Sequence, residues 1–397
     1  MMKIKLVLIL ILFLSAALLA TGASDGMAYA EEADEGQTQQ TSAEELMDEI
    51  DLSGLEEYFS TLNDGQKSLF GTSLDEYLRK IINGEFEFGY SSFFTYMLGA
   101  LGISIAEILP VLISIIAVAV LISFIGGMKG SFASQSVDGI VNFAGIALVS
   151  AIVLLQIFSA IRDTSALVTT LKTQMEAVFP ILFTLMTALG ASGSIAIYQP
   201  AVAVLAFSVT ELVSAIALPM LIITIVFSVV GNLSSSTKLG GMAKFFVSAA
   251  KWILYTSFFL FLTFLSVQGI TAAVYDNISV RTAKFALSKY VPVIGGYLSE
   301  GFNVILAGTV LIKNAVGLTA VIIMFVSVVP VLLKIIVVSL SLKLAGAVTE
   351  PFEGGKICGL LNSVSSSVNL LVAVILGMVF LYFVFLILII ASGNLVL

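Results

Sequence analysis

Long apolar stretches constrain this chain more than any other feature of its sequence. A helix of about 20 apolar residues is long enough to cross the hydrocarbon core of a membrane. The sequence therefore predicts an all-α polytopic membrane protein with about seven spanning helices, and counts of six to eight fit the pattern. The predicted spans are residues 103–125, 137–161, 176–198, 200–231, 245–268, 315–342 and 368–392.

Composition supports this class and divides the chain into unequal parts. Hydrophobic residues make up 59% of the 397 residues and charged residues 11%, whereas soluble domains hold about 25% charged residues. The net charge of −8 is unevenly spread: residues 31–100 carry 16 acidic and 3 basic side chains, while residues 101–397 carry 9 and 13. An acidic arm thus precedes a mildly basic membrane part, and no basic cluster indicates nucleic-acid binding.

The residue inventory excludes most enzyme chemistry. The chain has no histidine and one cysteine, Cys358, so it lacks the residues for a Ser-His-Asp triad, an imidazole or thiolate metal site, or an intrachain disulfide. It also lacks a G-x-x-x-x-G-K-[ST] phosphate loop. We therefore expect no catalytic residues, no cofactor and no metal, and any ATP hydrolysis must come from a partner.

Residues 1–30 have the features of a secretory signal peptide. Lys3 and Lys5 precede an apolar run over 6–20, which is short for a span, and small residues follow at 28–30. We predict cleavage after Ala30, with an uncleaved anchor as the alternative. In both cases the arm is exported.

The arm, residues 31–100, reads as a tether followed by short amphipathic helices. Residues 31–40 are acidic and poor in apolar residues, which favours disorder. Ser42 with Glu45 fits a capping box, and Ser73 with Glu76 begins a second helix that stops at 83–84. These helices fit a docking or membrane-surface element, or they pack on the protein's own outer face.

Ionisable residues inside the predicted spans are candidate functional groups, because they are costly in a membrane. Glu211 and Lys334 are the most interior; as a pair they would carry a proton or bind an ion, or serve only structurally. Glu107 is expected near the interface, at the start of its helix. Lys313 and Lys343 are expected to extend towards the membrane surface.

Four prolines recur in similar apolar settings, at 110, 180, 219 and 330. Proline in a spanning helix frees a carbonyl that a neighbouring helix, water or an ion must satisfy, although such matches also arise by chance in so apolar a sequence. The stretch 176–198 is ambiguous as well. If it is re-entrant, then Lys238, Lys244 and Lys251 move to the cytoplasmic side, as the positive-inside tendency favours.

The segment 268–317 is too polar for an ordinary span. Arg281 and Lys284 share one face of a helix expected to begin near Asp276, and Pro292 ends that helix. Gly295 and Gly296 would then form a flexible joint. We expect this segment at the membrane surface or lining a wet cavity.

The same segment resembles the stage III sporulation protein AE family. The resemblance lies in the strings Arg281-Thr-Ala-Lys-Phe285, Pro292-Val-Ile-Gly295 and Leu311-Ile-Lys-Asn-Ala-Val-Gly317, and the order of features is similar over about 100–397. It implies a non-enzymatic subunit in the mother-cell membrane around the forespore. Its implied partners are the other subunits of the complex, a separate cytoplasmic ATPase and a forespore membrane channel protein.

The resemblance carries no catalytic residues, so the candidates it leaves concern assembly or gating. A stand-alone secondary transporter that uses Glu211 and Lys334 is the alternative function. The candidate assembly or gating residues are Arg281, Lys284, Pro292, Gly295, Gly296, Lys313 and Asn314.

Overall fold

The computed structural model describes residues 33–71, 73–127, 135–233, 240–290, 295–353 and 356–392. The predicted signal peptide lies outside these residues, as does Pro292. Every element in the described part of the chain is helical, and the predicted all-α class is confirmed. The membrane part consists of α6 (Tyr90–Gly127), α7 (Gln135–Ala188), α8 (Ser192–Ala203), the π-helical turns η2 (Val204–Val209) and η3 (Leu212–Ala217), α9 (Leu218–Leu233), α10 (Gly240–Tyr290), α11 (Gly295–Glu353) and α12 (Lys356–Ala391).

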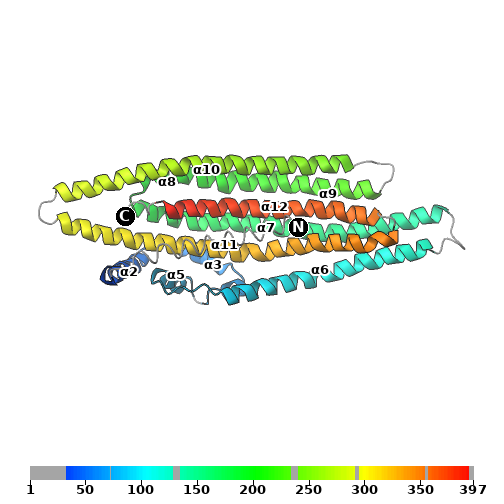
Figure 1. Cartoon of the computed structure of the whole chain (residues 1–397), viewed down its shortest axis with the longest axis horizontal. Coiled ribbons are helices and arrows are strands. Elements are labelled where there is room, and N and C mark those ends of the chain that lie inside the picture. The colour runs from blue at the N-terminus through cyan, green and yellow to red at the C-terminus, as the bar shows by residue number, and fades with distance from the viewer. Residues whose placement is uncertain are drawn as a thin grey trace.

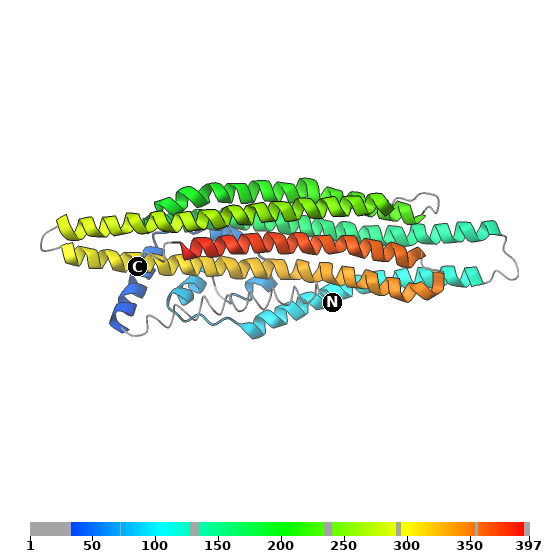
Figure 2. The same ribbon diagram turned by 45° about the horizontal axis from the view of Figure 1, so that its top comes forward.

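These elements form an elongated bundle of six rods, in which α8, η2, η3 and α9 together make one rod. Consecutive rods run in opposite directions (Figures 1 and 2). The 59 residues of α11 span about 88 Å at 1.5 Å per residue. The hydrocarbon core is only about 30 Å thick, so the bundle extends well beyond it.

Six of the helices described are long and apolar enough to cross a membrane. The count falls within the predicted range of six to eight, but 176–198 is not a separate crossing. α7 ends at Ala188, Gly190 turns the chain with a φ of 74°, and α8 runs back from Ser192. Glycine accepts this positive φ without the strain that a Cβ would bring. The reversal is hidden in the sequence, because apolar residues lie on both sides of it.

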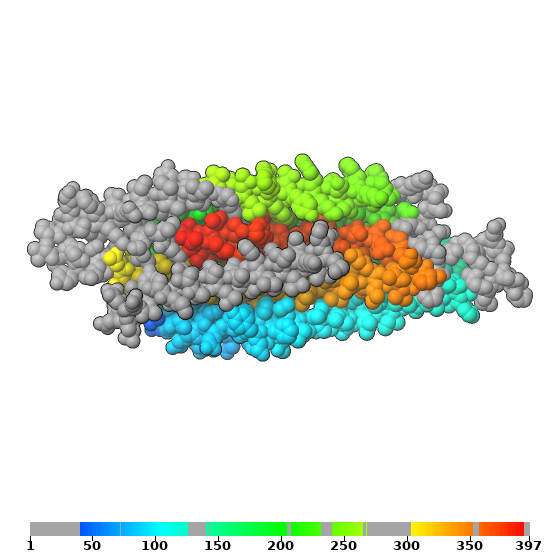
Figure 3. Space-filling view, viewed as in Figure 1, coloured from blue at the N-terminus to red at the C-terminus, as the bar shows by residue number. Residues whose placement is uncertain are grey.

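The core is built around α11 and α12, which pack along much of their length. In Figure 3 α12 lies between α10 and α11 on one face of the bundle. Glycines allow close approach at two points: a Cβ at Gly317 would meet Ile390 of α12, and one at Gly377 of α12 would meet Phe258 of α10.

The arm helices pack on the bundle itself, the second of the two alternatives left open by the sequence. They are α2 (Ala33–Met47), α3 (Ser53–Ser60), α4 (Asp64–Lys67) and α5 (Leu74–Ile82). α2 and α5 contact α11, and α3 contacts α7. At the tightest crossing, a Cβ on Gly308 of α11 would come within 3.1 Å of the Ala43 backbone nitrogen of α2.

One predicted helix start in the arm is confirmed and another is wrong. Ser73 caps α5, its hydroxyl accepting from the Glu76 backbone nitrogen at 3.3 Å. In contrast, Ser42 lies inside α2, which begins at Ala33, so the expected disorder over 31–40 is not what the structure gives from Ala33 onward. The alanine, glutamate and glutamine residues there are good helix formers. The buried Ala43 and Met47 attach the helix to the bundle.

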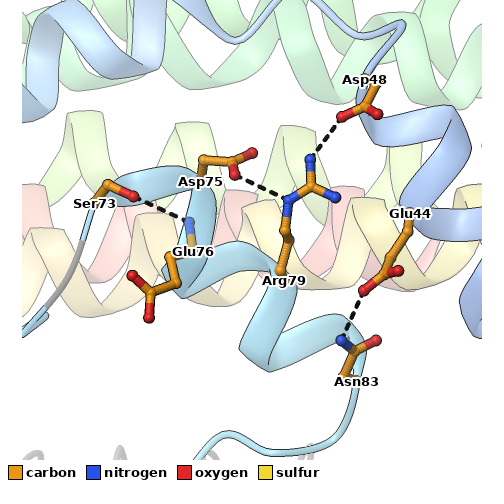
Figure 4. Close-up of polar contacts among 7 residues, drawn as sticks. All are labelled: Glu44, Asp48, Ser73, Asp75, Glu76, Arg79 and Asn83. Atoms are coloured by element: carbon orange, nitrogen blue, oxygen red, sulfur yellow. Dashed lines mark hydrogen bonds and ion pairs between the residues drawn. The ribbon is translucent and has the colours of Figure 1, made fainter.

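An arginine joins two helices of the arm (Figure 4). Arg79 of α5 donates from Nη2 to Asp48 at 2.6 Å and from Nε to Asp75 at 2.9 Å. Asn83 Nδ2 adds a bond of 2.8 Å to Glu44 Oε1 of α2. The hydrogen bonds from Arg79 to Asp75 and Asp48 raise the pKa of its guanidinium, so this connection persists at any pH at which the two carboxylates are ionised.

Candidate functional site: a proline and an ion triad in the bundle

Pro330 lies inside α11 and leaves one backbone carbonyl without its helical donor. That carbonyl belongs to Val326, four residues earlier. The Tyr96 hydroxyl of α6 donates to it at 3.0 Å, and Gln66 Nε2 of α4 approaches it at 3.4 Å. The expectation that a neighbouring helix satisfies a carbonyl freed by proline is therefore confirmed at Pro330.

The glutamine that reaches this carbonyl is held in place by the arm. Gln66 Oε1 accepts from the Asn63 backbone nitrogen at 3.0 Å, and the Gln66 backbone nitrogen donates to Asn63 Oδ1 at 2.9 Å. This is a reciprocal capping box at the start of α4. The cap leaves the Gln66 amide nitrogen directed at the Val326 carbonyl, so the arm contacts the backbone group that Pro330 leaves without a helical donor.

One turn beyond Pro330, Lys334 is shared by two carboxylates from two other helices. Its Nζ lies 3.0 Å from Glu107 Oε2 of α6 and 3.0 Å from Asp163 Oδ2 of α7. The side chains of Lys334 and Asp163 are 23% and 25% exposed, and that of Glu107 is 50% exposed. We call these three residues the ion triad. With one cation and two anions its formal charge is −1, and it joins α6, α7 and α11.

The structure places Glu107 differently from the sequence prediction. α6 begins at Tyr90 rather than near residue 103, so Glu107 lies 17 residues after Tyr90 and 18 before Ile125 in this candidate span. A search for apolar runs does not include the first turns of the helix, because these turns contain the polar residues Ser91, Ser92 and Thr95. Glu107 is therefore central in its helix and not at its start.

Glu211 and Lys334 are not brought together as an ion pair; the partners of Lys334 are Glu107 and Asp163. Glu211 is exposed and lies between the π-helical turns η2 and η3. Sequence reasoning missed Asp163 altogether, because it follows the end of the predicted span 137–161. No spacing signal could have found it, since it meets Lys334 only through the packing of α7 on α11.

Lys313 is fully buried, so the prediction that it extends to the membrane surface is wrong. Its Nζ donates to the backbone carbonyl of Ser392, at the carboxyl end of α12. The last carbonyls of a helix lack helical donors and carry partial negative charge, which makes this end a suitable place for a cation. The adjacent Asn314 is partly buried, whereas Lys343 is exposed.

The segment 268–317 forms the ends of two long helices and no separate helix near Asp276. α10 runs unbroken from Gly240 to Tyr290, because no proline interrupts it, and it ends two residues before Pro292. Gly295 and Gly296 are the first residues of α11, not a joint outside it. The side chains of Arg281 and Lys284 lie outside the described part of the structure, so their candidate role stays a prediction.

The ion triad has the chemistry of a charged junction between helices. In the described residues no group of three or more His, Cys, Asp or Glu side chains is arranged to hold a metal ion. The ion triad consists of an ammonium group held by two carboxylates, and the Glu107 carboxylate is half exposed on the outside of the bundle.

Comparison with known proteins gives one consistent result. The family model described as Stage III sporulation protein AE matches residues 72–393. The chain is also 25% identical over 367 residues to Stage III sporulation protein AE of Bacillus subtilis (strain 168), with 91% of each chain covered. No solved structure matches the chain significantly.

Proposed function

The chain belongs to the stage III sporulation protein AE family, and from this we propose that it is a non-enzymatic subunit of a membrane complex connecting the mother cell with the forespore. In this role it supports forespore development and late forespore gene expression. The observation that carries the proposal is the family match over 72–393, which includes all six candidate spans.

The partners we propose are the other subunits of the same complex, a separate cytoplasmic ATPase and a forespore membrane channel protein. The chain has no phosphate loop of its own, which is consistent with an ATPase on another subunit. The bundle is far longer than a bilayer is thick, so its ends are available to partners outside the hydrocarbon core. We place the protein in the mother-cell membrane with the arm on the extracytoplasmic side.

The alternative, a stand-alone transporter coupled through Glu211 and Lys334, gains no support from the geometry. Lys334 is already held by two other carboxylates, and Glu211 is exposed elsewhere.

Purification from sporulating cells tests the proposed function. The full-length protein, tagged and solubilised in a mild detergent, should bring down the neighbouring subunits and the ATPase. Cells that lack the protein should fail in late forespore gene expression. Recovery of a lone monomer, with late forespore expression intact in the deletion strain, would contradict the proposal.

The candidate assembly residues Arg281 and Lys284 lie near the end of α10, and we propose that they contribute to partner binding at that end of the bundle. Replacing both with alanine should reduce the recovery of partner subunits and lower spore yield. The matched control is Lys244→Ala with Lys251→Ala, which removes two charges near the other end of the same helix. Equal recovery of partner subunits with both double variants would show that Arg281 and Lys284 do not contribute to partner binding.

A further inference from the structure

One face of α6 is built like a helix interface but meets no other helix among the described residues. Cβ atoms placed on Gly99 and Gly102 would have no neighbour within 4 Å, whereas those on Gly145, Gly317 and Gly377 would each meet a side chain of another helix. Glycine in a helix interior costs about 1 kcal/mol relative to alanine, and in membrane helices small residues usually permit close packing. The remainder of this face is exposed and apolar: Leu98, Ile103, Ala106, Leu109, Pro110 and Ile113.

Glu107 lies at the edge of this face, one turn from Ile103 and from Pro110. Its side chain is half exposed, although it lies at the centre of a 36-residue candidate span. It shares Lys334 with Asp163, so the formal charge of the ion triad is −1. An apolar surface with an acidic group at mid-depth is complementary to an apolar helix that carries a basic group.

The cost of a charge in hydrocarbon points to the same kind of partner. A charged side chain at the centre of a spanning helix costs about 3 kcal/mol or more unless it is paired. A second cation at Glu107 would bring the local charge to zero. A second copy docked through the same face would instead bring two Glu107 carboxylates close together, which is unfavourable.

We propose that the α6 face formed by Gly99, Gly102, Ala106 and Glu107 binds a membrane-spanning helix of another subunit that carries a lysine or arginine at mid-depth. This inference rests on the proposed function, since it names the kind of segment through which a partner subunit is held. The glycines permit the two helices to approach closely, and Glu107 selects the partner by charge.

Crosslinking in cells identifies the occupant of this face. Cys358→Ser gives a cysteine-free background, and Gly102→Cys then places a single thiol on the face. A thiol-reactive benzophenone, attached to this thiol in sporulating cells and activated by light, inserts into nearby C–H bonds and should link it to a spanning segment of a different subunit, identified by mass spectrometry, with a lysine or arginine within about one turn of the contact. A crosslink to a second copy, to this chain's own residues, to a segment without a basic residue, or to no protein would overturn the proposal.

Substitutions separate charge from packing. Glu107→Gln and Gly102→Leu should each reduce recovery of the crosslinked subunit at least threefold. Asp163→Asn is the comparison for Glu107→Gln, because it removes the same formal charge from the ion triad but leaves the α6 face intact. A direct pair between Glu107 and the partner predicts the larger loss in Glu107→Gln, and equal losses would show that Glu107 does not bind the partner's cation itself. Gly241→Leu is the control for Gly102→Leu, since Gly241 of α10 also has no neighbour within 4 Å.

The outcomes distinguish this inference from the proposed function. If the wild-type protein recovers its partners but Glu107→Gln and Gly102→Leu recover them equally well, the α6 face is not the binding site and the proposed function stands. If the wild-type protein recovers no partner, the proposed function is contradicted, and the inference about the α6 face, which rests on it, is contradicted as well. Gly102→Leu keeps the ion triad whole, so its result holds even if Glu107→Gln misfolds.

Discussion

At the scale of single residues, the bundle depends on polar side chains placed among apolar helices. Lys334 is held by carboxylates from two helices, and the Val326 carbonyl is held by donors from α4 and α6. A group of this kind adds little net stability while its partners are present. Removing one partner is costly, because the groups that remain are left in a poorly solvated site.

Lys334→Met should therefore destabilise the protein by about 3 kcal/mol, the lower end for breaking a buried ion pair, since the ion triad is partly exposed. The substitution leaves Glu107 and Asp163 facing each other without a cation. Combining it with Glu107→Gln and Asp163→Asn should restore most of the loss. Thermal unfolding in detergent or nanodiscs measures both variants, and equal melting temperatures for the single and the triple variant would contradict the prediction.

The proline contact can be tested with a double-mutant cycle. Pro330→Ala restores a backbone N–H that can reach the Val326 carbonyl, so that carbonyl no longer needs the Tyr96 hydroxyl. Tyr96→Phe should then cost about 1 kcal/mol in the wild-type background and much less in the Pro330→Ala background. Equal costs in the two backgrounds would show that Tyr96 and Pro330 are not coupled.

The polar contacts around Pro330 and Lys334 were predictable only in part from the sequence. Four prolines in apolar runs led to the expectation of a freed carbonyl, and the structure supplies its partners at Pro330. The identity of these partners was not predictable, because Gln66 and Tyr96 lie 260 and 230 residues before Val326 in the chain. The same holds for Lys334: its position in a span predicted a partner, but the identity of that partner depends on the rotation and order of three helices.

At the scale of elements, the arm is attached to the bundle by a few defined contacts. α2 crosses α11 at Gly308, and α5 is joined to α2 by Arg79 and Asn83. Burial of the Tyr77 side chain of α5 raises the pKa of its hydroxyl, because the phenolate would lose its hydration. The arm is thus a packed layer, held by both apolar and polar contacts.

Arg79→Ala should loosen α2 without unfolding the protein. Exposed ion pairs contribute at most about 1 kcal/mol each, so the global melting temperature should change little. Backbone amide exchange in α2 should nevertheless become faster. Lys80→Ala is the matched control, since among the described residues the ion pair of Lys80 is with Glu76 of the same helix, at 3.0 Å. Equal exchange in the two variants would argue against the connection.

Gly308→Leu should displace α2 from α11. The Cβ would lie 3.1 Å from the Ala43 nitrogen and 3.3 Å from its Cα, and a backbone cannot rotate away as a side chain can. We expect overpacking to cost about 1–3 kcal/mol and to open the arm to limited proteolysis. Gly240→Leu, at a position with open space, should do neither. An unchanged proteolytic pattern in Gly308→Leu would contradict the observed crossing.

Apolar runs predicted the class of fold well and the ends of its helices poorly. A run over 176–198 looks like a crossing, yet the chain reverses at Gly190. The start of α6 was placed 13 residues too late, because serine and threonine interrupt the run without breaking the helix. Both errors have one cause: apolarity reports the environment of a residue, whereas the chain direction is set by backbone geometry and packing.

At the scale of the whole molecule, six antiparallel rods place alternate connections at opposite ends. α6 ends and α10 begins at one end of the bundle; α7 ends at the other, on the side where the arm packs (Figure 1). If the arm is extracytoplasmic, as we propose, Lys244 and Lys251 of α10 face the cytoplasm, as the positive-inside tendency favours.

Labelling of single cysteines tests this orientation. In the Cys358→Ser background, expressed in non-sporulating cells so that the extracytoplasmic side faces the medium, Ser60→Cys in the arm and Ser192→Cys at the start of α8 should react with a membrane-impermeant maleimide added to intact cells. Gly241→Cys should react only after the membrane is opened. Labelling of Ser192→Cys from the cytoplasmic side alone would show that the rods cross the membrane in a different arrangement.

The contact between Lys313 and Ser392 bears on how the protein is made. Lys313 lies in α11, whereas the carbonyl that accepts from it belongs to Ser392, which directly follows the last residue of α12. This buried ammonium therefore acquires that acceptor only after the whole of α12 has been synthesised. Chains truncated before Ser392 would retain the lysine and lose the carbonyl, so they would bury a cation without this acceptor.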